Sequence, residues 1–106
     1  MATKMDQIHD VFKSLSDKEL LLDVRQPDEF KEFRIPGSRN IPHDQILQFA
    51  DELKEYDKIY VYCRSGNRSQ IATQMLASVD AANNVFLVDD VGMNYWRDQG
   101  YEIEEG

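Results

Sequence analysis

The sequence predicts a three-layer α/β fold in which a mostly parallel central sheet is flanked by helices. Three observations predict it. Short apolar runs without alternation recur at residues 20–24, 59–62 and 85–88, as expected of strands buried on both faces. Amphipathic segments with a period of about 3.6 residues separate these runs. The chain has 106 residues, which fits a single domain over residues 1–106.

The first half of the chain is expected to supply two helices and two strands. One helical face is predicted by Ile8, Val11, Phe12 and Leu15, which recur at i, i+3, i+4 and i+7. The strand at 20–24 follows. A short helix can run from Pro27 through Phe33, because proline suits the first helical position and acids suit the first turn. Residues 35–38 then predict a turn, and residues 39–41 a very short strand.

The second half alternates in the same way. An amphipathic helix is expected over residues 44–55, before the β-branched and aromatic strand at 59–62. A further helix begins at Ser69. Its apolar face is expected to hold Ile71, Ala72, Met75, Leu76 and Val79. Another buried strand follows at 85–88, and the last helix ends at Gly100, a residue type that suits a C-terminal cap.

The composition is acidic, with 20 Asp and Glu residues against 12 Lys and Arg residues and a net charge of -8. Proteins that bind nucleic acid usually present a basic face, because they must replace phosphate counterions. Neither nucleic acid nor an anionic membrane is therefore expected as a partner. No apolar run approaches the ~20 residues that span a bilayer, and the first residues lack the apolar stretch of a secretory signal. The expected location is cytoplasmic.

Cys63 is the only cysteine, which rules out an internal disulfide and a zinc site built from several cysteines. No metal and no cofactor are expected. A lone cysteine is more often a small buried apolar residue than a nucleophile, so its surroundings decide between the two. Between Ile59 and Val79 the sequence has no Asp or Glu, but it has Arg64 and Arg68. This basic segment in an acidic chain predicts a local anion site.

The segment from Cys63 to Ser69 joins a predicted strand to the helix after it. It therefore lies at the carboxyl end of a strand, where α/β sheets bind ligands. Gly66 and Asn67 tolerate unusual backbone angles, and Ser65 and Ser69 are candidate capping residues. Such a loop can turn successive N–H groups inward as a nest for an anion, and the helix start adds positive potential. The same features favour the thiolate form of the cysteine.

This pattern predicts Cys63 as the catalytic nucleophile of a two-step, covalent sulfur transfer. The thiolate would take the outer sulfur of a small anionic donor such as thiosulfate and hold it as a persulfide. Cyanide, a dithiol, or a thioredoxin-like or sulfur-carrier protein would then accept it. The residues expected to bind the donor are Arg64, Ser65, Gly66, Asn67, Arg68 and Ser69. Arginine keeps its charge and offers planar donors; the alternative, above all for Arg68, is that it folds back to hold the loop.

Asp23 and Arg25 lie at the end of the first buried strand, near the same sheet edge, and are candidates for a supporting role. Arg25 is expected to be structural and to pair with an acid such as Asp28 or Glu29.

Four segments, in order, resemble the rhodanese family over about residues 20–101. They are LLDVRQPDEF at 21–30, IPGSRNIP at 35–42, CRSGNRS at 63–69, and a closing motif with Gly92, Trp96, Gly100 and Tyr101. The resemblance implies a parallel sheet flanked by helices and sulfane transfer through the loop cysteine. The loop arginines resemble members that use thiosulfate, since those that use 3-mercaptopyruvate tend to have small, uncharged loop residues.

Two pairs of residues depart from the family pattern. Phe33 and Arg34 stand where the family often has Gly-His, and Val91 and Gly92 stand where it usually has paired glycines. Both changes are expected to reshape the rim of the pocket. They bear on substrate preference more than on the type of reaction.

Other interpretations stay open. The chain could be a relay module that passes persulfide sulfur to a dedicated protein acceptor. It could be a cysteine-dependent phosphatase or arsenate reductase, but their loops place five residues between Cys and Arg. Here four residues separate Cys63 from Arg68, a loop too tight for phosphate. It could be a non-catalytic module, although inactive domains with this fold usually lack the cysteine. Finally, Cys63 could be buried and inert.

Overall fold

A central parallel sheet organises the computed structural model, which describes residues 2–106. Its strand order is β3-β1-β4-β5, and all neighbouring strands are parallel. The strands are β1 (Glu19–Asp23), β3 (Arg39–Asn40), β4 (Lys58–Tyr62) and β5 (Val85–Leu87). The helices are α1 (Met5–Phe12), α2 (Pro27–Glu32), α3 (Ala50–Leu53), α4 (Asn67–Ser78) and α5 (Met93–Asp98), with a 3-10 helix, η1 (His43–Phe49). The predicted fold class is confirmed.

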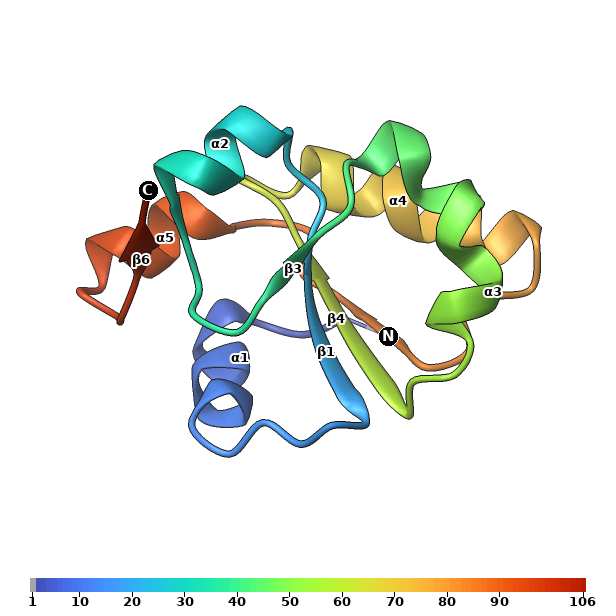
Figure 1. The fold of residues 1–106 in the computed structure, drawn as a ribbon, viewed down its shortest axis with the longest axis horizontal. Coiled ribbons are helices and arrows are strands. Elements are labelled where there is room, and N and C mark those ends of the chain that lie inside the picture. Colours follow the sequence, from blue (N-terminus) through green and yellow to red (C-terminus); the bar gives the residue numbers. More distant parts are fainter. Residues whose placement is uncertain (1) are drawn as a thin grey trace.

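Both faces of this sheet are covered by helices. Successive side chains of a strand point to opposite faces. In β1, Leu20 and Leu22 pack on one face and Leu21 on the other; β4 continues the pattern with Ile59 on the first face and Tyr60 on the second. Figure 1 shows α3 and α4 on one side of the strands and α1 and α5 on the other. This double cover explains why the strands read as apolar runs without alternation.

The helix expected over residues 44–55 is divided into η1 and α3. The change falls at Phe49, whose φ of -110° and ψ of 8° leave the helical region. The guanidinium of Arg39 lies over the Phe49 ring, 5.5 Å from its centroid. Ile46 and Leu53 are nevertheless both buried, so the apolar spacing correctly identified the buried face.

α4 buries a narrower stripe than its sequence predicts. Ala72 and Leu76 are fully buried, and Met75 packs beside them. Ile71 and Val79 are 44% and 41% exposed, so their assignment to the buried face is wrong. Only one side of α4 contacts the sheet, and a residue 100° away around the helix already faces solvent.

A small second sheet was not predicted. β2 (Phe33–Arg34) pairs antiparallel with β6 (Glu104–Glu105), and Arg34 Nε donates a 3.2 Å hydrogen bond to Glu104. Phe33 is buried. The two residues that depart from the Gly-His pattern therefore hold the carboxyl-terminal segment against the domain.

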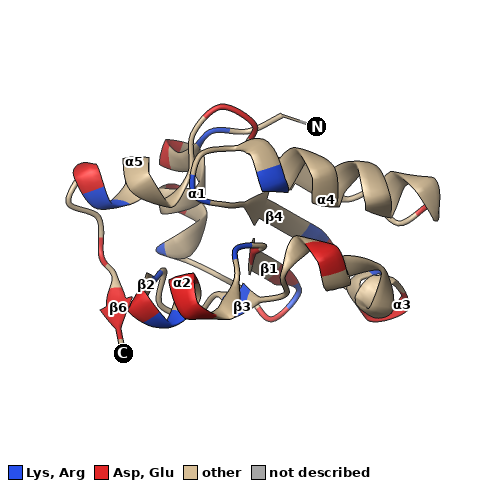
Figure 2. Ribbon diagram, turned by 90° about the horizontal axis from the view of Figure 1, so that it is seen from above, with Lys and Arg blue, Asp and Glu red and all other residues tan. Residues whose placement is uncertain are grey.

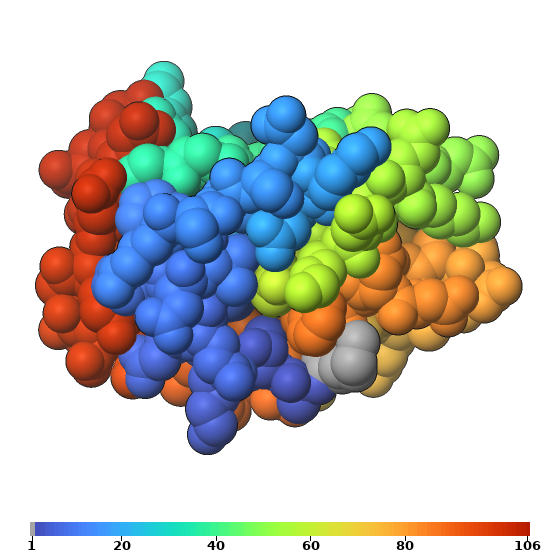
Figure 3. Space-filling view, turned by 90° about the horizontal axis from the view of Figure 1, so that it is seen from below, coloured from blue at the N-terminus to red at the C-terminus, as the bar shows by residue number. Residues whose placement is uncertain are grey.

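The amino-terminal helix lies against the carboxyl-terminal segment, as the contact between blue and red atoms in Figure 3 shows. The Asp6 carboxylate accepts hydrogen bonds from Tyr95 Oη at 2.8 Å and Tyr101 Oη at 2.7 Å. The Asp6 contact raises the pKa of Tyr101 to about 12. α1 ends at Phe12, so Leu15 lies after the helix. Leu15 still packs against the apolar cluster that contains Ile8 and Trp96. Among residues 2–106, no helix is long and apolar enough to cross a membrane.

Candidate active site

Cys63 lies at the carboxyl edge of the sheet, between the last residue of β4 and the start of α4. The exposed fraction of Cys63 is only 1%. The N–H of Gly66 donates a hydrogen bond to Cys63 Sγ at 3.0 Å, and Ser69 Oγ lies 3.7 Å from the same sulfur. The sulfur therefore sits inside the turn that begins α4, where unpaired N–H groups and the helix dipole favour negative charge.

Gly66 makes this turn possible. Its φ is +107°, a left-handed conformation that favours glycine, and it is the N-cap of α4. A Cβ on Gly66 would also collide with the backbone carbonyl of Asp89. The unusual backbone angle falls on Gly66 rather than on Asn67, which is the exposed first residue of α4.

Neither loop serine caps α4, so that prediction is wrong: the N-cap has no side-chain hydrogen bond. Ser65 is exposed. Ser69 is fully buried, and its hydroxyl lies 2.9 Å from the carbonyl oxygen of Gly66 and 2.5 Å from that of Val88. Ser69 therefore ties the loop to the residue that follows β5.

The start of α5 supports the Cys63 loop from behind. Met93 N–H donates to the Cys63 carbonyl at 2.8 Å, and Asn94 N–H donates to the Arg64 carbonyl at 3.3 Å. A Cβ on Gly92 would overlap the Cys63 carbonyl oxygen and the Arg64 backbone. Gly92 is therefore needed for close packing, since its φ of -171° is ordinary extended backbone.

Both loop arginines bind one carboxylate, that of Glu29 in α2. Arg64 Nε lies 3.1 Å from Glu29 Oε2. Arg68 places Nη1 2.5 Å from Oε1 and Nη2 2.9 Å from Oε2. The hydrogen bonds from Arg68 lower the pKa of Glu29 to about 2, and the same contact raises the pKa of Arg68. The loop has no acid nearby in sequence, but the fold supplies one.

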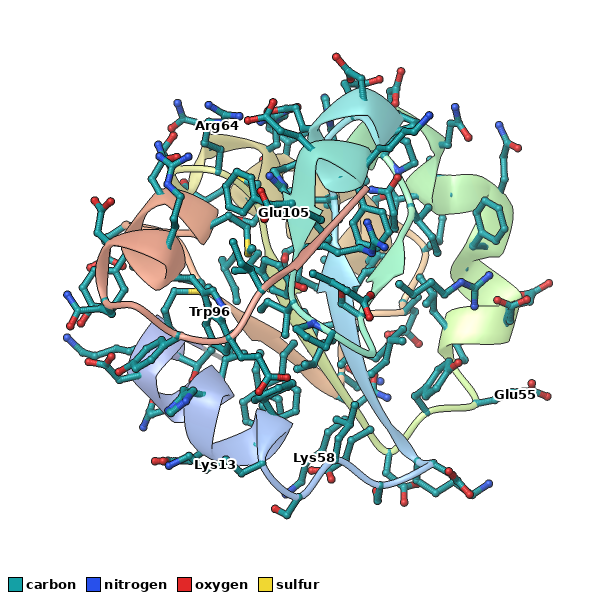
Figure 4. All side chains as sticks on the ribbon, turned by 60° about the vertical axis from the view of Figure 1, so that its left-hand side comes forward. Lys13, Glu55, Lys58, Arg64, Trp96 and Glu105 are labelled. Carbon is teal, nitrogen blue, oxygen red and sulfur yellow. The ribbon has the colours of Figure 1, made fainter. Side chains whose placement is uncertain are left out.

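The figures place the two segments that carry these residues. In Figure 4, Arg64 lies at the top of the molecule, where the pale cyan ribbon of α2 is also found. Figure 2 shows α2 largely in the red of acidic residues and a blue basic segment at the start of α4.

Asp23 and Arg25 form a fully buried ion pair beneath this edge, with Arg25 Nη2 2.8 Å from Asp23 Oδ2. The expectation that Arg25 pairs with Asp28 or Glu29 is wrong: the Arg25 side chain folds back and binds the carboxylate of Asp23, two residues earlier in the sequence. Arg25 Nη2 also donates to the carbonyl of Phe33 at 2.7 Å. Burial raises the pKa of Asp23, and the hydrogen bonds from Arg25 oppose that rise. The pair fixes the chain between β1 and α2, and so the position of Glu29.

A hollow of about 230 Å³ lies beside the loop. Its lining residues are Arg64, Ser65, Asp90, Val91, Gly92, Asn94, Tyr95 and Asp98. Val91, where the family pattern has a glycine, is part of this wall. The hollow joins one arginine to two carboxylates, so it is not a purely basic pocket.

The predicted site residues thus divide into groups. Gly66 and Ser69 surround the Cys63 sulfur, Arg64 and Arg68 converge on Glu29, and Ser65 faces the hollow. Asp23 and Arg25 lie in their own buried pair. Glu29 was not identified as a site residue. The available signal was its place in the first segment that resembles the rhodanese family.

Comparisons with known proteins identify the family and the fold. The Rhodanese-like domain family matches residues 8–99. The adenylyltransferase and sulfurtransferase UBA4 of Meyerozyma guilliermondii is 36% identical over 86 residues, which cover 74% of this chain and 20% of that protein. YrkF of Bacillus subtilis, whose name proposes a sulfur-carrier role, is 42% identical over 62 residues, covering 58% of this chain and 34% of that protein. The chain thus spans about a third of one relative's length and a fifth of the other's.

Solved structures share the fold. A rhodanese-related protein from Thermoplasma volcanium has a TM-score of 0.80 at 27% identity, covering 97% of this chain and 96% of that one. A thiosulfate sulfurtransferase from Pseudomonas aeruginosa has a TM-score of 0.83 at 24% identity, covering 99% of this chain and 20% of that one. With the family match extending over residues 8–99 and a cysteine loop at the carboxyl edge of a parallel sheet, the chain belongs to the Rhodanese-like domain family.

Proposed function

We propose that the chain is a sulfurtransferase that carries sulfane sulfur as a persulfide on Cys63, taken from thiosulfate or a similar anionic donor. The observation that carries this proposal is the position of the sulfur. Cys63 Sγ accepts the N–H of Gly66 at 3.0 Å, at the start of α4. A sulfur held by backbone donors at a helix start is stabilised as an anion, both as the thiolate and as the persulfide.

The first step moves one sulfur atom without an external oxidant. The Cys63 thiolate attacks the outer sulfur of thiosulfate, and a new S–S bond forms between Sγ and that sulfur. The S–S bond of the donor breaks, and its electron pair leaves with sulfite. The products are a cysteine persulfide anion and a sulfite dianion, so charge is conserved. Backbone N–H groups of the loop would hold the terminal sulfur, and Arg64 and Arg68 would supply positive charge for the leaving group.

The second step regenerates the thiolate. Cyanide attacks the terminal sulfur and leaves as thiocyanate. A dithiol takes the same sulfur and then closes to a disulfide, releasing it as hydrogen sulfide. Because the residue of Cys63 is only 1% exposed, both reagents reach the sulfur only when loop residues move aside.

A persulfide relay to a protein acceptor is the second candidate. It is favoured by the contact of both loop arginines with Glu29, since guanidinium groups already bound to a carboxylate attract free anions less. Relatives named for sulfur transfer within larger proteins, such as UBA4, are consistent with this role. The acceptor would then be a thioredoxin-like or sulfur-carrier protein.

Thiocyanate formation from thiosulfate and cyanide tests the proposal. The wild-type chain should turn over, and the Cys63→Ser variant should not, with both showing the same melting temperature. Transfer by Cys63→Ser at the wild-type rate would reject the mechanism. A very high KM for thiosulfate, together with rapid loading from a thiol persulfide, would favour the relay.

A further inference from the structure

The acid that binds both loop arginines is built into the fold. Glu29 is the third residue of α2, and its Oε1 also accepts the N–H of Gln26 at 3.1 Å, as part of a capping arrangement. Its side chain is 19% exposed. One carboxylate is thus fixed by its own helix start and by two guanidinium groups from a different segment of the chain.

This contact removes much of the anion-binding capacity of the loop. Both Nη groups of Arg68 and the Nε group of Arg64 are engaged by Glu29. In the part of the chain that the structure describes, no hydrogen bond engages the two Nη groups of Arg64. Arg64 also lines the hollow that contains Asp90 and Asp98. A dianion approaching Cys63 therefore meets one partly available arginine among three carboxylates.

We propose that Glu29 is a specificity-determining residue, which competes with free sulfur oxyanions for Arg64 and Arg68 and so weakens the binding of thiosulfate relative to that of a thiol persulfide. This inference rests on the proposed sulfur transfer at Cys63. It concerns which donor that site accepts. Glu29 acts through the two arginines and does not touch Cys63.

The two donors make different electrostatic demands. A thiolate and thiosulfate bring three negative charges together, which requires cationic groups at the site. With a thiol persulfide, R–S–SH, the thiolate attacks the outer sulfur and the S–S bond of the donor breaks. The electron pair of that bond leaves with the inner sulfur, as the thiolate R–S⁻. The proton stays with the transferred sulfur. One negative charge is present before and after, so occupied arginines impede this reaction little.

Protonation does not neutralise the Glu29 carboxylate at or near neutral pH. The hydrogen bonds from Arg68 hold the pKa of Glu29 at about 2, so the carboxylate stays charged well below neutral pH. Its effect on donor choice is therefore permanent in the native protein and is best tested by substitution.

Glu29→Gln keeps the size of the side chain and removes its charge. We expect the KM for thiosulfate to fall about tenfold and to become more dependent on salt, because two guanidinium groups then face the donor. The KM for glutathione persulfide should change less than about twofold. Glu29→Asp, which keeps the charge on a shorter side chain, should lie between Glu29→Gln and the wild type.

Asp28→Asn is the matched control. It removes the same charge one residue away, from an exposed position that forms no ion pair with either arginine among residues 2–106. Its KM for thiosulfate should stay within about twofold of the wild-type value. An equal decrease in Asp28→Asn would show that general acidity, rather than the Glu29 contact, sets donor choice.

Melting temperatures and intact mass complete the experiment. A folded Glu29→Gln variant whose KM for thiosulfate is unchanged or higher overturns the inference. So does an equal loss of kcat with both donors, since that result describes a residue that only holds the loop. If neither donor adds sulfur to Cys63 in the wild type, the proposed function itself fails. If both donors add sulfur but Glu29→Gln leaves the donor preference unchanged, only the role of Glu29 is rejected.

Discussion

The carbonyl oxygen of Cys63 packs against the Cα of Gly92, with no room for a side chain between them. The two residues belong to different segments: Cys63 directly follows β4, and Gly92 is the N-cap of α5. The hydrogen bond from Met93 N–H to the same carbonyl fixes this approach at 2.8 Å. The position of the nucleophile is therefore set from behind the loop as well as from α4.

Gly92→Ala should impair sulfur transfer through this contact. The added methyl group must displace the Cys63 carbonyl, which costs about 1–3 kcal/mol as overpacking. Gly100→Ala is the control, because its φ of +74° gives strain of roughly 1–2 kcal/mol with no atom within 4 Å of the new Cβ. Urea unfolding should show similar destabilisation of both variants, whereas thiocyanate formation should drop only in Gly92→Ala. Equal activities would show that the packing behind Cys63 does not govern the site.

Access to Cys63 should depend on the size of the reagent. The residue is 1% exposed, so a small alkylating agent such as iodoacetamide should react faster than a bulky aromatic disulfide, relative to the rates in unfolded protein. Mass spectrometry measures both rates on the only cysteine. A folded protein that neither reagent labels would favour the interpretation of Cys63 as a buried, inert residue.

Glu29 should stabilise the protein down to strongly acidic pH. Its pKa is lowered from 4.5 to about 2 by contact with Arg68. A carboxyl group with a lowered pKa in the folded state adds stability that is complete above its unfolded value and is lost as the pH falls through the folded value. The stability difference between wild type and Glu29→Gln should therefore persist at pH 5 and shrink between about pH 4.5 and pH 2. Urea unfolding across this range measures it, and a pH-independent difference would contradict the assignment.

The buried pair of Asp23 and Arg25 should be costly to break on one side only. Arg25→Met leaves the Asp23 carboxylate buried without its partner, at a cost of about 3–5 kcal/mol. The double variant Asp23→Asn with Arg25→Met removes both charges and should recover part of that loss. Chemical unfolding of the two variants gives the comparison. A single variant that is no less stable than the double one would show that the charge on Asp23 is not the cause.

The sheet and the cysteine loop could be predicted because their signals are local. The strands are apolar along their length, since helices cover both faces. The segment from Cys63 to Ser69 carries its glycine and both arginines within one short stretch of sequence. The left-handed backbone at Gly66 follows from the same short stretch.

What could not be predicted depends on contacts between distant segments. Glu29 lies 35 residues before Arg64 and 39 before Arg68, and its place in the first family-like segment does not indicate which distant residues it binds. β6 consists of two exposed glutamates, which carry no strand pattern. Ile71 has the spacing of a buried residue but lies beyond the part of α4 that the sheet covers.

The most direct test of sulfur transfer at Cys63 is intact-protein mass spectrometry after incubation with thiosulfate or glutathione persulfide, without reductant. The account predicts a gain of one sulfur atom, reversed by cyanide or a dithiol and absent in Cys63→Ser. No gain from either donor, with Cys63 still reactive towards iodoacetamide, would contradict it.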